Sequence, residues 1–339
     1  MTGRRAFLAA FSAGVVTAGL AAAVASVALG PRVVVAQTAS KVPRVGILGL
    51  FAPELGARSV AAVREGLAEL GWREGQNIHF ELRYASGKRD QLGPLTAELV
   101  QQKVDVIVAI GTDAILAAKT GTSTIPIVMA GVADPVGSGL VASLARPGGN
   151  VTGMSLMMSD LIGKQLQLLK EAAPRASRVG LISLRGPFHD GLVKEAETAA
   201  PRLGLKIHRM VLREPLTLDD LVPELRKARV DAVLGLANPA LDDVRVRVVE
   251  IVNAQRLPSV FALTYWAEAG GLMSYAADLY ATQRRAATFV DKLLKGANAA
   301  ELPVEQPTQF QFVINAKTAR ALRLSLPPAI LIRADRVIE

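Results

Sequence analysis

The chain contains no cysteine among its 339 residues. This absence excludes disulfide bonds, thiolate nucleophiles, cysteine-ligated zinc and a lipid-modified cysteine as a membrane anchor. Histidine is scarce as well, with 3 residues, of which His79 and His208 occupy matching positions in different halves of the chain. Because such positions lie far apart in space, they do not form the cluster that a metal site needs. We therefore expect no metal and no cofactor.

Aromatic residues make up only 4% of the chain, and no long run of lysine or arginine occurs. The formal net charge is +9, from 39 basic and 30 acidic residues, and three of the arginines (Arg4, Arg5 and Arg32) lie near the N-terminus. Nucleic-acid-binding proteins concentrate basic residues on one face and often interleave aromatic ones. The scattered charge of this chain instead indicates an ordinary solvated surface, so we expect no nucleic-acid partner.

Motifs that carry catalytic chemistry are missing too. The segment Gly148–Ser155 imitates a phosphate-binding loop, but Met154 stands where the loop needs lysine. The segment Gly153–Met157 lacks the second glycine of a nucleophile elbow, and no nucleophile has an evident base. We therefore predict that the protein is not an enzyme. The alternative is a periplasmic enzyme whose catalytic carboxylates are distant in sequence.

The first 36 residues have the layout of an export signal. Arg4 and Arg5 precede a long Ala/Val/Leu/Gly run, and small residues follow up to Ala36. This order of charge, apolar run and small residues is that of a secretory signal peptide, and the Arg-Arg-x-Phe-Leu core resembles a twin-arginine signal. An uncleaved membrane anchor is the alternative, since the run is long enough to span. We expect cleavage near Ala36 and a periplasmic protein, by either the twin-arginine or the general secretory route.

Short apolar runs rich in β-branched residues alternate with helical patterns from Arg44 onward. The same programme occurs twice, at a nearly constant separation. The matching segments are 44–48 with 178–182, 77–79 with 206–208, 103–107 with 229–233, and 125–128 with 257–260. Alternating strands and helices give a parallel sheet with helices on both faces. The sequence therefore predicts two α/β lobes of the same design, with a cleft at the carboxyl ends of their strands.

The pattern changes after Tyr275. A long amphipathic helix is predicted over residues 278–295, followed by a proline-rich segment and a strand over 310–314. We expect this helix to return to the first lobe and the tail to rejoin the second. Lobe 1 then comprises residues 42–152 and 277–306, and lobe 2 comprises 153–276 and 307–339. Three such crossovers permit hinge closure over a ligand.

Candidate ligand contacts lie in the loops that follow the strands. We expect them at Phe51, Thr112, Asp134, Asn238, Tyr265, Tyr275 and Asp278. Short polar residues there precede helices, whose N-terminal N–H groups favour an anion such as a carboxylate. Thr112 and nearby amides would hold a carboxylate, Asp278 or Asp134 an ammonium group, and Asn238 and Tyr265 the remainder.

Five of these candidates also have a structural alternative. Thr112, Asp134 and Asp278 are suitable helix N-caps, and Asn238 before a proline is a suitable turn residue. Tyr265 and Trp266 could lie in the core, or they could form a stacking wall. The sequence leaves these alternatives open.

Several motifs resemble one protein family. They are Gly71–Ile78, Ile125–Met129, Ala133–Gly153, Gly270–Tyr275, Leu302–Pro307 and the closing 326–338. They are similar to the substrate-binding proteins of ABC transporters, which have the type I periplasmic binding fold and include tryptophan- and tyrosine-binding members. The resemblance covers residues 42–339.

This resemblance implies capture of a small solute, such as an amino acid or a similar carboxylate, and its delivery to an ABC permease in the inner membrane. It does not fix the solute. We expect a monomer, and a ligand-sensing module for a membrane receptor is the alternative function.

Overall fold

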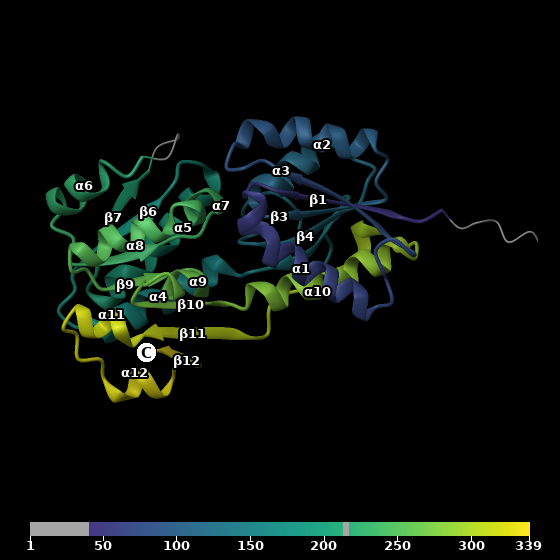
Figure 1. Cartoon of the computed structure of the whole chain (residues 1–339). Helices are drawn as coiled ribbons and strands as arrows, with labels where there is room; N and C mark the ends of the chain where they lie inside the picture. Colours follow the sequence, from purple (N-terminus) through teal and green to yellow (C-terminus); the bar gives the residue numbers. More distant parts are fainter. Residues whose placement is uncertain (1–40, 213–216) are drawn as a thin grey trace, which may run out of the picture. The chain divides into compact units, whose positions relative to one another are not determined.

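The computed structural model describes residues 41–212 and 217–339 (Figure 1). The predicted signal peptide, residues 1–36, lies outside this part of the chain. Within it, Val42–Glu339 forms one compact unit that contains two sheets. No helix in the described ranges is both long and apolar enough to cross a bilayer.

The first sheet has five parallel strands in the order β2-β1-β3-β4-β5. Its strands are β1 (Arg44–Gly49), β2 (His79–Tyr84), β3 (Val106–Ile110), β4 (Ile127–Val132) and β5 (Val151–Ser155). The helices between them are α1 (Pro53–Glu69), the 3-10 turn η1 (Arg89–Gln91), α2 (Leu92–Gln101) and α3 (Thr112–Gly121). Every residue of β3 is buried, as expected for a parallel strand covered on both faces.

The second sheet has seven strands in the order β7-β6-β8-β9-β10-β11-β12. Its strands are β6 (Arg178–Ser183), β7 (Lys206–Val211), β8 (Ala232–Gly235), β9 (Ser259–Phe261), β10 (Met273–Ala277), β11 (Phe310–Asn315) and β12 (Arg336–Ile338). The first five repeat the order of the first sheet, and β11 is antiparallel to β10. The predicted architecture of two α/β lobes of the same design is confirmed.

Helices and short turns connect the strands of the second sheet and follow them. They are α4 (Met158–Ala172), α5 (Pro187–Ala199), η2 (Ala200–Leu203), α6 (Leu221–Lys227), α7 (Pro239–Asp243), α8 (Arg245–Ala254), α9 (Thr264–Glu268), α10 (Leu279–Leu294), η3 (Ala299–Glu301), α11 (Ala316–Ala321) and α12 (Pro328–Ile332). Although α10 follows β10 in the chain, it packs against α1 and against β4 and β5 of the first sheet (Figure 1).

An apolar core lies between the first sheet and the pair of helices α1 and α10. It includes Val45, Val63, Leu67, Val128 and Val290, all of which are 0% exposed. The two helices approach closely at Gly66, where an added Cβ would lie 2.3 Å from the carbonyl oxygen of Arg284. The first lobe is therefore completed by a helix that is remote in sequence.

The crossing from the first sheet into the second lobe follows β5. Gly153 lies inside this strand with a φ of +130°, and an added Cβ would lie 2.4 Å from the carbonyl oxygen of Met129. The predicted lobe border between residues 152 and 153 therefore falls within β5, which pairs with β4 up to Ser155. Residues 135–139, which lie between β4 and β5, form a hydrogen-bonded turn. The chain then enters α4 through Met157, which has a φ of +53°.

Candidate functional site

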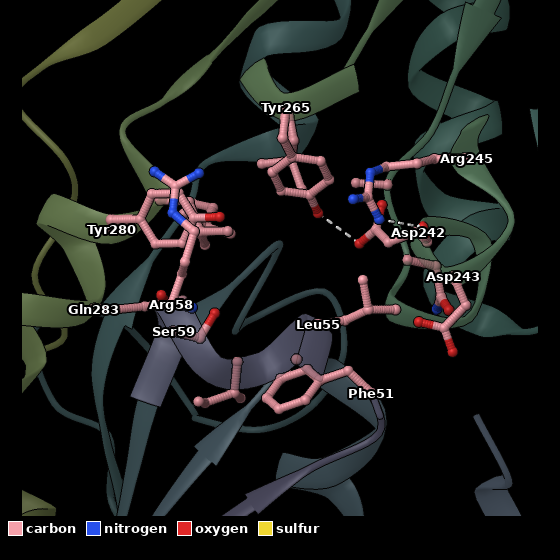
Figure 2. Close-up of a pocket in the computed structure, with 18 of the residues that line it drawn as sticks. Phe51, Leu55, Arg58, Ser59, Asp242, Asp243, Arg245, Tyr265, Tyr280 and Gln283 are labelled. Atoms are coloured by element: carbon pink, nitrogen blue, oxygen red, sulfur yellow. Dashed lines mark hydrogen bonds between the residues drawn. The ribbon is translucent and has the colours of Figure 1, made fainter. Parts of the chain in front are cut away.

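A cavity of about 430 Å³ lies among the loops and helices at the carboxyl ends of both sheets (Figure 2). Its wall is built from the start of α1 and α3 in the first lobe, from α7 to α9 in the second, and from α10. This volume lies in the usual range for small-molecule sites. The cleft expected from the duplicated design is therefore present between the two sets of strand ends.

Four of the predicted ligand residues line this cavity, namely Phe51, Thr112, Asn238 and Tyr265. Phe51 follows β1, is only 7% exposed and packs at a tilt against Tyr84, with 5.9 Å between the ring centroids. Thr112 is the first residue of α3, where the free N–H groups of the helix begin. The structure thus brings these four residues together from segments that are up to 214 positions apart.

Asn238 and Thr112 lie in opposite lobes, and both line the cavity. The Asn238 side-chain amide donates to Oδ2 of Asp113, the neighbour of Thr112, over 3.4 Å. Asp113 also forms an ion pair with Arg89, with 3.3 Å between Nε of the arginine and Oδ2 of the aspartate. The two lobes are therefore in polar contact beside the helix N-terminus that the sequence singled out.

The other three predicted residues lie outside the cavity wall. Asp134 accepts from the Gly137 backbone N–H over 2.8 Å and so stabilises the turn after β4. Tyr275 lies in β10 and stacks on Phe310, with 6.1 Å between the ring centroids. These two residues have structural partners that explain why the sequence contains them.

Asp278 likewise lies outside the wall. It caps α10, because its Oδ1 accepts from the Ala281 N–H over 3.0 Å, while Oδ2 accepts from the Gln311 amide over 2.6 Å. Asp278 is therefore a helix N-cap, whereas Asp134 stabilises a turn, because no helix begins at that position. Neither residue lines the cavity.

Asp242 is a cavity residue that the sequence reasoning missed. Its Oδ2 accepts from the Tyr265 hydroxyl over 2.6 Å (Figure 2). Its Oδ1 accepts from Nε1 of Trp266 over 2.7 Å. Burial raises the pKa of the Asp242 carboxyl to about 7, although both hydrogen bonds and nearby Arg245 act in the opposite direction. The carboxyl group therefore changes its charge near neutral pH.

Tyr265 and Trp266 lie in different environments, and the core alternative holds for Trp266. Trp266 is 1% exposed and stacks on Phe261 with 4.7 Å between centroids, so it belongs to the core. Tyr265 lines the cavity. Arg245 lies 5.5 Å from the centre of its ring and donates to the Asp242 carbonyl oxygen over 2.8 Å.

A second polar region of the wall lies on α1 and α10 (Figure 2). The Arg58 guanidinium lies over the Tyr280 ring, 4.2 Å from its centroid. Ser59 and Gln283 lie beside this pair on the same wall and are buried, at 7% and 0% exposure. Neither nitrogen nor oxygen of the Gln283 side-chain amide has a hydrogen-bond partner among the residues that the structure describes.

These missed residues carry little signal of their own. Leu279, Gln283 and Ala287 are spaced by four residues and therefore share one face of α10. A glutamine between two apolar residues on that face is the one signal that the sequence offers. Asp242 follows Asn238 by one helical turn in α7, which would have placed it on the same face.

The lining of the cavity presents several kinds of chemical group to a ligand. It combines ring faces with acidic, basic and amide groups, which together match a small solute of mixed charge. Among the residues that the structure describes, no group of three or more His, Asp or Glu side chains is placed to hold a metal ion.

Comparison with known proteins gives a consistent result. The model of a protein family described as ABC transporter substrate binding protein matches residues 53–338. A tyrosine-binding protein of Clostridioides difficile (strain R20291) is 26% identical over 259 residues, which cover 76% of this chain and 74% of that protein.

Solved structures agree with the architecture. The ABC domain from Streptococcus pneumoniae in complex with L-Trp is 25% identical, with a TM-score of 0.80 over 87% of this chain and 99% of that one. A conserved domain protein of Vibrio cholerae is 26% identical, with a TM-score of 0.81 over 88% of this chain and 100% of that one. The fold is accordingly that of the type I periplasmic binding proteins.

Proposed function

The chain belongs to the family of ABC transporter substrate-binding proteins, and we propose that it captures a small amino-acid-type solute for an ABC importer. Members of this family bind small molecules and work with a membrane permease, and two of the relatives described above are named for an amino acid that they bind. A tyrosine-binding relative and a tryptophan complex support an amino acid, or a similar carboxylate, as the solute.

One observation supports the proposal: a helix N-terminus of the first lobe and a carboxyl group of the second both line the cavity. Thr112 opens α3, whose N–H groups favour the carboxylate of an amino acid. Asp242, in place of Asp134 or Asp278, provides the negative charge for the ammonium group. Phe51 and Tyr265 supply ring faces, and Asn238 adds an amide beside Thr112.

Binding closes the two lobes by a hinge motion. The wall draws on both lobes, so a ligand gains its full set of contacts only when they approach each other. Differential affinity of this kind shifts the population toward the closed form. The segments that cross between the lobes, near residues 155–158, 277–279 and 305–310, would absorb the movement.

Export to the periplasm is part of the proposal. Substrate-binding proteins of ABC transporters are typically exported, and residues 1–36 have the pattern of a cleaved signal peptide. Replacing Arg4 and Arg5 by lysine in the full chain, followed by cell fractionation, distinguishes the twin-arginine route from general secretion. If the wild-type protein were found in the cytoplasmic fraction and not in the periplasmic one, the proposed location would be wrong.

Isothermal titration of the mature protein with single amino acids tests the binding function. Mass spectrometry of small molecules released from the purified protein identifies the solute independently. We expect saturable heat with at least one amino acid and recovery of an unaltered solute. Binding of another solute class alone would remove the amino-acid part, and chemical conversion of the bound solute would contradict a pure binding role.

A further inference from the structure

Gln283 is a buried glutamine among the residues that line the cavity. It is 0% exposed, and both polar atoms of its side-chain amide lack a partner within the described ranges 41–212 and 217–339. Buried amide groups are nearly always hydrogen-bonded, because removing one from water without compensation is unfavourable. An amide that borders a cavity can obtain its partner from whatever occupies that cavity.

The packing around Gln283 does not itself require a polar residue. On α10 it continues the buried face formed by Ala286, Ala287 and Val290, which covers the first sheet. An unbranched apolar side chain of the same length, such as methionine, would fill the same volume. Packing at this position therefore does not explain why the side chain carries an amide group.

The side chains near Gln283 define the kind of group that fits there. Tyr280 and Arg58 present flat surfaces stacked at 4.2 Å, and Leu55 lies on the same cavity wall (Figure 2). Flat and apolar surfaces favour a ring or an extended chain. The amide adds one donor, Nε2, and one acceptor, Oε1, at the same point.

We propose that Gln283 is a specificity-determining residue that recognises the tip of the solute's side chain. It selects an amino acid whose side chain ends in a group that both donates and accepts a hydrogen bond, either a phenol hydroxyl or a carboxamide. Nε2 of Gln283 donates to the oxygen of this group, and Oε1 accepts its O–H or N–H hydrogen. This assignment rests on the proposed function, in which Thr112 and Asp242 hold the amino-acid head.

Two matched ligand pairs test the assignment by isothermal titration. L-Tyrosine and L-phenylalanine differ by one hydroxyl, while L-glutamine and L-methionine differ mainly in the amide. Each pair is titrated into wild type, Gln283→Met and a control, Gln101→Met, which makes the same change at an exposed position of α2 outside the cavity. Circular dichroism of all three proteins confirms that they are folded.

In wild type and Gln101→Met we expect the hydrogen-bonding member of at least one pair to bind roughly 10-fold more tightly, or better. In Gln283→Met this preference should fall to about 2-fold or less, with the apolar member bound as well as before or better. An effect in the tyrosine and phenylalanine pair identifies a phenol hydroxyl as the recognised group. An effect in the glutamine and methionine pair identifies a carboxamide.

The assignment is overturned if neither pair is distinguished by the wild type, or if the preference survives in Gln283→Met. In both cases, binding of an amino acid would leave the proposed function intact. A wild type that binds no amino acid would remove the proposed function and this assignment with it.

Discussion

Tyr265 donates its hydroxyl hydrogen to Asp242 over 2.6 Å, and the next residue, Trp266, donates to the other oxygen of the same carboxylate over 2.7 Å. Two consecutive residues of α9 thus hold one carboxyl group of α7 at the cavity wall. The rings differ in environment, since Trp266 is buried in the core whereas Tyr265 faces the cavity. The arrangement fixes the position of a charge that a ligand can use.

Ligand affinity should depend on pH through Asp242. Its pKa is raised to about 7, so below that pH a ligand ammonium group must first displace a proton. The affinity for an amino acid should then fall by up to about tenfold per pH unit below pH 7 and level off above it. Titrations between pH 5.5 and 8.5 measure this dependence. Asp242→Asn should bind weakly with a flat profile, and a wild-type profile equally flat would contradict the assignment of the ammonium site.

Stability without ligand should respond to pH with a defined sign. The pKa of Asp242 rises from 3.8 to about 7 on folding, so the folded state holds this proton more tightly than the unfolded chain. The stabilisation from the protonated form is complete below about pH 4 and is lost as pH rises through 7. Relative to Asp242→Asn, the wild type should therefore lose free energy of unfolding between pH 4 and pH 8. Urea unfolding at both pH values checks this, and a relative gain would refute it.

Replacing Gln283 with methionine should stabilise the ligand-free protein. Removal of a buried amide that has no partner among the described residues, at nearly constant volume, should raise the free energy of unfolding by about 1–3 kcal/mol. Urea unfolding of Gln283→Met and wild type measures the difference. Destabilisation would mean that the amide has a partner in the folded protein and is not held ready for a ligand.

Gly153→Ala should be strongly destabilising. A Cβ at this position would lie 2.4 Å and 2.6 Å from backbone atoms of Met129, and the φ of +130° disfavours alanine in any case. We expect a loss on the order of 3 kcal/mol in free energy of unfolding. Gly149→Ala is the matched control, because an added Cβ there meets nothing within 4 Å. Equal stability of the two variants would show that β5 does not need a glycine.

Asp278→Ala separates capping from ligand binding. Loss of the N-cap of α10 should cost about 1 kcal/mol of stability. The affinity for an amino acid should stay within about twofold of wild type, since Asp278 does not line the cavity. Thermal unfolding and titration on the same sample measure both quantities. A large loss of affinity with unchanged stability would restore the direct role that its place in the sequence suggested.

The architecture could be predicted because it is written in local patterns. The fully apolar segment at β3 and the glycine after α1 define a strand and a helix end without tertiary information. The repeated order of such segments predicted two lobes, and the two sheets indeed share the order of their first five strands. Thr112 followed from the same reasoning, because it stands between a buried strand and a helix.

The remaining cavity residues depend on contacts that no local pattern encodes. Asp134 and Asp278 do not line the cavity, although the sequence suggests both as ligand residues. The reason is that a carboxylate that stabilises a turn or caps a helix occupies the same kind of position in the sequence as one that binds a ligand. Asp242 and Gln283 are distinguished only by which partners surround them in space: two ring donors in one case and no described partner in the other. Burial and partners are properties of the fold, so these two residues became evident only in the structure.

The return of α10 to the first sheet sets an order on how the protein can be made. A ribosome delivers β1 to β5 well before residues 279–294, which form the helix that covers one face of their sheet. Until then the apolar side chains of β1, β4 and α1 lack their cover, and exposed surface of this kind favours aggregation. The first lobe therefore cannot be completed until most of the second lobe has been synthesised. During that time its uncovered apolar face is available for a chaperone to bind.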